Sequence, residues 1–194
     1  MAKYITATCV ILLCFSSCKS NLFDVGETIG DTVIELQFNL INYLDPSQKE
    51  LVYGEDPQIP GDGGVTEIES PAKTIDITDE IGDVKSIESV NLFVGYDMIN
   101  ESGWANLQYI VYFSEVGEDP FSVPGIFSEK IELRPQHTTN GGLTITADER
   151  LKGLFEKKKF QYAAKLRFET QSGSGPLLGK AVLNEFKADI VLTI

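Results

Sequence analysis

Alternation of apolar and polar residues with a period of two is the dominant pattern from residue 34 to the end of the chain. In residues 34–40 (IELQFNL) every second side chain is apolar. The same period recurs in the segments 90–98, 107–113, 160–168 and 186–194. A strand that buries one face and exposes the other produces this pattern. The chain is therefore predicted to be built mainly from β-strands.

Turn-forming residues separate these predicted strands. Residues 100–103 (NESG) stand between two of them, so 87–113 is predicted to form a β-hairpin. Residues 140–142 (NGG) predict another turn. Two longer connections, 45–72 and 117–128, contain prolines and lack periodicity. They are predicted to be loops, the first with one short strand near its end.

A single helix is predicted near residues 147–157. Thr146 and Glu149 have the spacing of a capping box, and Leu151, Leu154 and Phe155 follow on one helical face. About eight strands with one short helix indicate an all-β fold. We expect a β-sandwich, with an immunoglobulin-like arrangement as one candidate topology and a closed barrel as the alternative.

The first eighteen residues have a different pattern. Lys3 precedes an apolar run, residues 4–15, which is shorter than the roughly 20 residues that a membrane-spanning helix needs. Residues 15–18 (FSSC) then resemble the lipobox of bacterial lipoproteins. The resemblance implies that Cys18 receives a diacylglyceryl thioether and becomes the mature N-terminus. Ordinary secretion, with cleavage after Cys18, is the alternative.

This N-terminal pattern divides the chain into three parts. Residues 1–17 are predicted to be a lipoprotein signal peptide, 18–31 a lipidated N-terminus and polar tether, and 32–194 a single β-sandwich ectodomain. The predicted location is the bacterial cell envelope, at the outer membrane, with the Cys18 lipid as the membrane contact. Nothing in the tether indicates whether the domain faces the periplasm or the cell surface.

Cysteine usage and charge narrow the classes of protein that the chain can be. All three cysteines lie in residues 1–18, so the ectodomain is expected to contain no disulfide, zinc thiolate site or cysteine nucleophile. The chain has 16 basic and 29 acidic residues and a formal net charge of −13. Because nucleic-acid binding requires basic side chains, this charge argues against a nucleic-acid partner.

An acidic segment is the best candidate for a metal site. Asp76, Asp79, Glu80 and Asp83 lie within eight residues, and Ca²⁺ prefers hard oxygen ligands of this kind. The spacing does not fit an EF-hand. The segment is therefore either a calcium site or a solvated acidic turn.

Three aromatic residues are candidates for contacts with a partner. Trp104, the only tryptophan, follows the predicted turn, while Phe121 and Phe127 lie in an unusually apolar connection. Exposed aromatic side chains mark recognition surfaces for proteins and glycans. The alternative is that these side chains fold back and close the end of the sandwich.

Three functional hypotheses remain. The first is a non-enzymatic, lipid-anchored binding or structural module. The second is a carrier of an apolar ligand such as a lipid, which requires a void lined by residues such as Phe160, Phe168 and Phe186. The third is a glycan-active enzyme, which requires two convergent carboxylates. An enzyme is not expected, because no catalytic motif is present and the only histidine, His137, lies in a polar segment.

Overall fold

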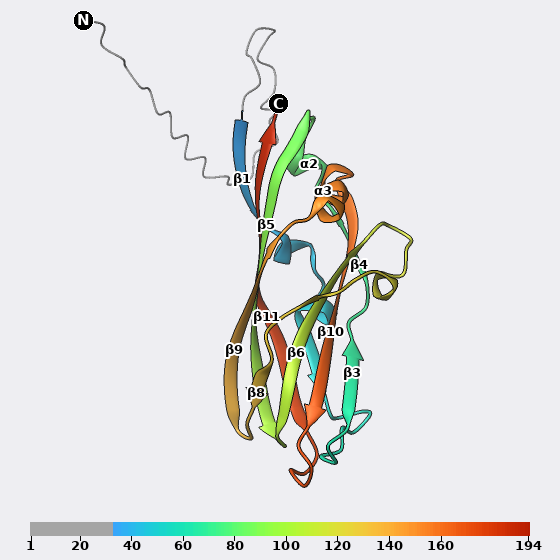
Figure 1. The fold of residues 1–194 in the computed structure, drawn as a ribbon, viewed down its shortest axis with the longest axis vertical. Coiled ribbons are helices and arrows are strands. Elements are labelled where there is room, and N and C mark those ends of the chain that lie inside the picture. Colours follow the sequence, from blue (N-terminus) through green and yellow to red (C-terminus); the bar gives the residue numbers. More distant parts are fainter. Residues whose placement is uncertain (1–32) are drawn as a thin grey trace, which may run out of the picture. The chain divides into compact units, whose positions relative to one another are not determined.

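The computed structural model describes residues 33–194, which form two antiparallel β-sheets packed face to face (Figure 1). The first sheet has the order β1-β11-β5-β9, with β2 beside β11. Its strands are β1 (Val33–Asn39), β2 (Glu50–Tyr53), β5 (Ser86–Ser102), β9 (His137–Thr146) and β11 (Leu178–Thr193). The prediction of an all-β sandwich is confirmed.

The second sheet has the order β3-β10-β6-β7, with β4 beside β10 and β8 beside β6. Its strands are β3 (Val65–Glu69), β4 (Lys73–Asp76), β6 (Ala105–Ser114), β7 (Ile126–Phe127), β8 (Ile131–Leu133) and β10 (Lys159–Thr170). The helical elements are short: η1 (Leu40–Tyr43), α1 (Pro46–Lys49), α2 (Thr78–Ile81), η2 (Pro120–Ser122) and α3 (Glu149–Glu156). The region 45–72, predicted as a loop with one strand, thus contains α1, β2 and β3.

The alternating apolar residues of the two sheets meet in one core. Tyr109 of β6 and Tyr162 of β10 lie within it, and their hydroxyl oxygens are 3.0 Å apart in a hydrogen bond. The ring of Tyr96, from the first sheet, stacks on Tyr109 with 4.6 Å between ring centroids. Such contacts across the two layers hold the sheets at a fixed separation.

The predicted hairpin over residues 87–113 is wrong. The two strands form at the expected places, but β5 pairs with β9 and β11, whereas β6 pairs with β7, β8 and β10. The connection at Gly103 and Trp104 therefore crosses from one sheet to the other. An alternating strand can pair beside its sequence neighbour or pack across the core from it, and the apolar pattern is the same in both cases.

The predicted turn at residues 140–142 is also wrong, because β9 runs through it. The side of Gly141 that would carry a Cβ atom faces the ring of Tyr96, and such an atom would lie 2.3 Å from Cε2 of the ring. A glycine inside a strand often permits such a close approach. Gly141 therefore makes room for a core aromatic ring and does not turn the chain.

The predicted helix is confirmed as α3, with a different cap. Thr146 ends β9, and the side chain of Asp148 accepts a hydrogen bond from the Leu151 amide at 2.8 Å. A carboxylate at this position satisfies an amide that the first helical turn leaves unpaired. Leu154 and Phe155 then pack into the core at the end of the sandwich where α3 lies (Figure 1).

Candidate functional site

The two ends of the sandwich differ. Val33, where the described chain begins, pairs with Thr193 near the C-terminus, at the end that carries α2 and α3 (Figure 1). At the other end, Ser102 pairs with Leu178, and the connections after β2, β5, β8 and β10 gather there. We call this the loop end. The 17 residues of β5 run between the two ends, about 50 Å at the usual rise of a strand.

Trp104 lies at the loop end, in the short connection between β5 and β6. Its carbonyl oxygen accepts hydrogen bonds from the Gln171 amide at 2.9 Å and the Ser174 hydroxyl at 3.4 Å. The preceding Gly103 has φ +76°, and a Cβ there would lie 2.8 Å from the Pro176 carbonyl oxygen. The connection is therefore tight and fixed, so Trp104 has a defined position although it is only half-buried.

An open groove of about 470 Å³ runs beside Trp104. Among its lining residues are Trp104, Asn106, Glu132, Glu169, Gln171 and Ser172. The Arg134 guanidinium lies over the indole, 5.9 Å from the ring centroid, and forms an ion pair of 2.8 Å with Glu132. We call this the tryptophan groove.

The second carboxylate of the tryptophan groove is also ion-paired. Lys130 lies 2.9 Å from Glu169 and donates a hydrogen bond to it. This hydrogen bond and the lysine charge lower the pKa of Glu169. Glu169 is therefore ionised at neutral pH and can accept hydrogen bonds from a ligand. The groove combines an aromatic ring, carboxylates and amides, which suits a polar partner with apolar faces.

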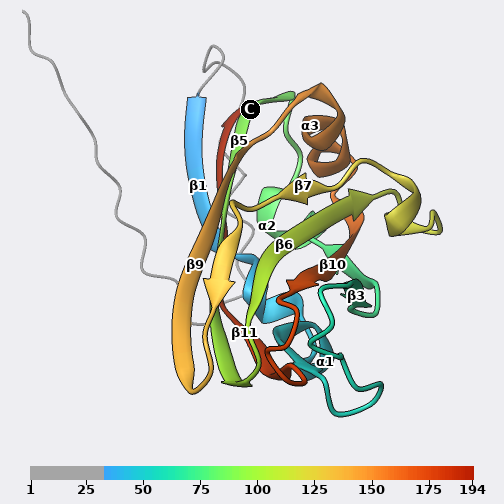
Figure 2. The ribbon, with the colours of Figure 1, turned by 60° about the horizontal axis from the view of Figure 1, so that its bottom comes forward.

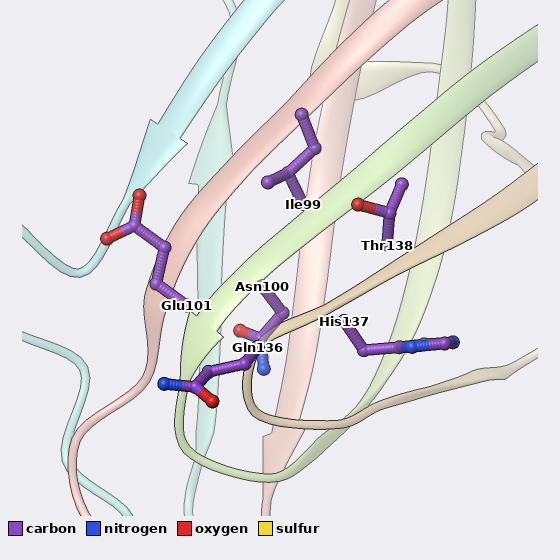
Figure 3. Close-up of a pocket in the computed structure, with 6 residues that line it drawn as sticks. All are labelled: Ile99, Asn100, Glu101, Gln136, His137 and Thr138. Carbon is purple, nitrogen blue, oxygen red and sulfur yellow. The ribbon is translucent and has the colours of Figure 1, made fainter.

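A second hollow lies close by, lined by Ile99, Asn100, Glu101, Gln136, His137 and Thr138 (Figure 3). The close-up shows the imidazole of His137 and the carboxylate of Glu101 pointing in opposite directions. Asn100 is buried, donates to the Gly103 carbonyl at 2.9 Å and accepts from the Tyr53 hydroxyl at 3.3 Å. Asn100 therefore fixes the connection to Trp104.

The four carboxylates of the predicted calcium site are not brought together. Asp76 accepts two hydrogen bonds from Thr78 and lies 2.9 Å from Lys159, and these contacts hold its pKa at about 2. Asp79 lies in the first turn of α2. The partners of the other two are basic or phenolic: Tyr43 donates to Glu80, and Lys158 lies 3.8 Å from Asp83.

In residues 33–194, no three histidine, cysteine, aspartate or glutamate side chains are close enough to hold a metal ion. The acidic segment at 76–83 therefore gives the calcium prediction no geometric support, and Asp76 and Asp83 lie beside lysines instead. No helix in the described part of the chain is both long and apolar enough to cross a membrane.

Phe121 and Phe127 have different surroundings. Phe121 folds back on the second sheet, where its ring meets Tyr112 edge-on with 5.1 Å between centroids, and Lys165 lies 5.3 Å from its centroid. These contacts fix η2 on the sheet, in a small cluster with Ile110. Phe127 is 51% exposed in β7. Of the two, only Phe127 presents its ring mainly to solvent.

The aromatic rings that a carrier would need as the lining of a void contact other rings instead. Phe160 lies 4.7 Å from Phe155, and Phe186 lies 5.0 Å from Tyr162, measured between ring centroids. Phe168 similarly contacts a tyrosine of β2. All three phenylalanines are fully buried. Their surfaces are therefore used in packing the two sheets together.

No family model matches the chain, and no curated protein matches its sequence. Among solved structures, a chain in the structure of the infectious bursal disease virus Gx strain superposes on 85% of this chain, with a TM-score of 0.39 and 10% identity. This chain spans 32% of that viral chain. At this TM-score the likeness carries no argument about function. Cys18 and the tether lie outside the described residues, so the lipid anchor stays a prediction.

Proposed function

We propose that this protein is a lipid-anchored binding module of the bacterial cell envelope, attached to the outer membrane through Cys18. It is a non-enzymatic module that presents the loop end, with Trp104, to a protein or glycan partner. The support for the anchor is the sequence pattern of residues 1–18. The support for the binding role is the tryptophan groove, which combines an aromatic ring with ionised carboxylates.

One observation carries the proposal: the chain enters the sandwich at the end opposite the tryptophan groove. Val33 pairs with Thr193 at one end of β11, whereas Leu178, at the other end of β11, pairs with Ser102, two residues before Trp104. We infer that a tether that ends near Val33 leaves the groove, at the other end of the sandwich, free to face away from the membrane. This is the geometry that a binding module on a membrane needs.

The anchor is tested by replacing the lipidated cysteine. Cys18→Ser should lose incorporation of radiolabelled palmitate and leave the membrane fraction or accumulate as precursor, because a lipidated protein needs the thioether for stable attachment. Cys14→Ser, a cysteine in the same leader, is the matched control and should behave like the parent. If Cys18→Ser is labelled and fractionates like the parent, the anchor is disproved.

The orientation is tested with a single fluorescent label at each end of the sandwich. The lipid on Cys18 leaves no free thiol in the mature chain, so Ser172→Cys labels the loop end and Glu149→Cys labels α3. In vesicles containing spin-labelled headgroups, the label at position 149 should be quenched more strongly than the label at 172. Equal quenching, or stronger quenching at 172, would contradict the proposed presentation of the loop end.

A further inference from the structure

The outer face of the first sheet carries an exposed phenylalanine at its centre. Phe93 lies in β5, between β9 and β11, and is 38% exposed, whereas its neighbours Leu92 and Val94 are buried in the core. Figure 2 shows these strands in the layer opposite β6 and β10. Phe93 thus occupies a position in the strand pattern where polar residues are expected.

Two paired glycines form a flat support beneath this ring. Gly95 of β5 is directly opposite Gly142 of β9. A Cβ at Gly95 would lie 3.3 Å from Cε1 of Phe93, and one at Gly142 would lie 3.4 Å from both Cε2 and Cζ. The ring therefore extends over the glycine pair and keeps part of its surface toward solvent. Glycine inside a strand weakens it and often marks a site where another group approaches closely.

A row of polar side chains continues the same face beyond the ring. Asp97 Oδ1 accepts hydrogen bonds from Asn140 Nδ2 at 2.5 Å and from Asn184 Nδ2 at 2.9 Å. Because both amides donate to one carboxylate, their orientations are fixed. Within the described part of the chain, neither the amide oxygen of Asn140 nor the second oxygen of Asp97 accepts a further side-chain hydrogen bond, whereas Asn184 Oδ1 is directed at Gly95.

The position of Asn184 depends on an irregularity in β11. The pairing of β11 with β5 shifts between Leu183 and Glu185, which inserts Asn184 as an extra residue on the outer face. A Cβ at Gly95 would lie 2.8 Å from Asn184 Oδ1, so the glycine also makes room for this amide. The absence of a side chain at Gly95 therefore makes room both for the Phe93 ring and for Asn184, so the ring and the polar row form one continuous surface.

We propose that this surface, defined by Phe93, Asp97, Asn140 and Asn184, binds a segment of a neutral polysaccharide. A pyranose has an apolar C–H face, which matches the exposed face of Phe93, and hydroxyl groups, which match the fixed row of acceptors and amides. The carboxylate of Asp97 at the centre of the row disfavours acidic sugars by charge repulsion. An open sheet face suits an extended chain of sugars rather than a small enclosed ligand.

This binding surface goes beyond the function proposed above, because it lies away from the tryptophan groove. Its success or failure does not depend on the lipid on Cys18 or on the orientation of the domain.

The full-length protein in detergent can be titrated calorimetrically with neutral hexasaccharides: cellohexaose, laminarihexaose, xylohexaose, mannohexaose and maltohexaose. Hexagalacturonate serves as the acidic counterpart.

At least one neutral hexasaccharide should bind when its concentration is about 10 mM, because a site with a millimolar dissociation constant is mostly occupied at that concentration. Phe93→Ala should weaken that binding about tenfold or more, because aromatic anchors are costly to truncate, while Phe93→Tyr retains the stacking ring. Asn140→Ala should weaken it as well. Phe127→Ala, which removes an exposed ring from the other sheet, is the matched control and should bind like the parent.

Three results would overturn the proposal. They are no heat with any neutral hexasaccharide, binding of hexagalacturonate alone, and equal affinity of Phe93→Ala and the parent. Circular dichroism and the fluorescence of Trp104 verify that each variant is folded. Because Phe93 and Asn140 are on the solvent face, these variants leave the core contacts of β5 and β9 unchanged.

Discussion

The hydroxyl pair of Tyr109 and Tyr162 allows a sharp test of how the core is built. Both rings are fully buried, and their oxygens, 3.0 Å apart, are hydrogen-bonded to each other. Replacing Tyr162 by phenylalanine leaves the Tyr109 hydroxyl without this partner in an apolar interior. Such an unpaired buried group costs about 1–3 kcal/mol, and Tyr109→Phe should cost a similar amount.

The double variant Tyr109→Phe/Tyr162→Phe should be less destabilised than the sum of the two single variants. It leaves no unpaired hydroxyl, and replacement of both partners by apolar groups of the same shape is expected to cost less than about 1 kcal/mol. The two substitutions are therefore predicted to be strongly coupled. The rings and their packing with Tyr96 stay in place in all three variants.

Urea unfolding followed by the fluorescence of Trp104 gives the three free energies. The midpoints should move while the slopes stay unchanged, because the surface exposed on unfolding is the same. Additive losses, with the double variant as unstable as the two single variants combined, would refute the reasoning. They would show that the hydroxyl groups do not depend on each other for their hydrogen bonding.

Three further predictions concern pH and glycine. Burial raises the pKa of Tyr109 to about 12 from 10.0, so its contribution to the free energy of unfolding should be fully present below pH 10 and be lost between pH 10 and 12, as measured by urea titration. Thr78 and Lys159 lower the pKa of Asp76 to about 2 from 3.8, so its contribution should be lost as the pH falls from 4 to 2, and Asp76→Asn should flatten that part of the profile. Gly141→Ala should destabilise the protein by about 1–3 kcal/mol, because its Cβ would overlap a core ring. Gly153→Ala should stabilise it by about 0.5–1 kcal/mol, because a Cβ at this position of α3 meets no other atom. Thermal melting measures both changes, and equal shifts in melting temperature would contradict the role assigned to Gly141.

The strands were predictable because burial on one face imposes a period of two. Residues 34–39 show it without interruption, residues 160–168 depart from it only at Ala163, and both segments are strands. Pairing partners were not predictable from that period. Segments 87–102 and 105–113 look like a hairpin in sequence, yet they belong to different sheets. A strand's alternation records which face is buried and carries no information about which neighbour donates its hydrogen bonds.

Helix α3 was also predictable from its apolar face, although its cap was misplaced by two residues, from Thr146 to Asp148. Both residue types are good caps, and the choice depends on where β9 ends. The glycines at 141 and 142 predicted a turn because glycine is common in turns. Their actual role depends on Tyr96 and Phe93, which lie more than 40 positions away in the sequence and could not be placed beside them from the pattern.

The candidate sites were predicted unevenly. Trp104 was identified from its position after a turn, and it does line a groove. The acidic segment was identified by composition. Composition cannot show that Thr78 donates a hydrogen bond to the Asp76 carboxylate and that Lys159 forms an ion pair with it. Phe93 was overlooked, although the sequence contains its signal: an aromatic residue at a polar position of the alternation, followed two residues later by a glycine.

The pairing of β1 with β11 has a mechanical consequence. Seven residue pairs, from Val33 with Thr193 to Asn39 with Lys187, lie along the direction of a pull between the chain's entry point and the loop end. Such a pull loads all the hydrogen bonds of this ladder at once, in shear, since they lie across the strands. A pull between Val33 and Ile194 would instead peel β1 away one pair at a time. A domain held at Val33 and loaded through the loop end should therefore resist force far better than the same domain pulled by its two ends, a difference that single-molecule force measurements along the two directions can detect.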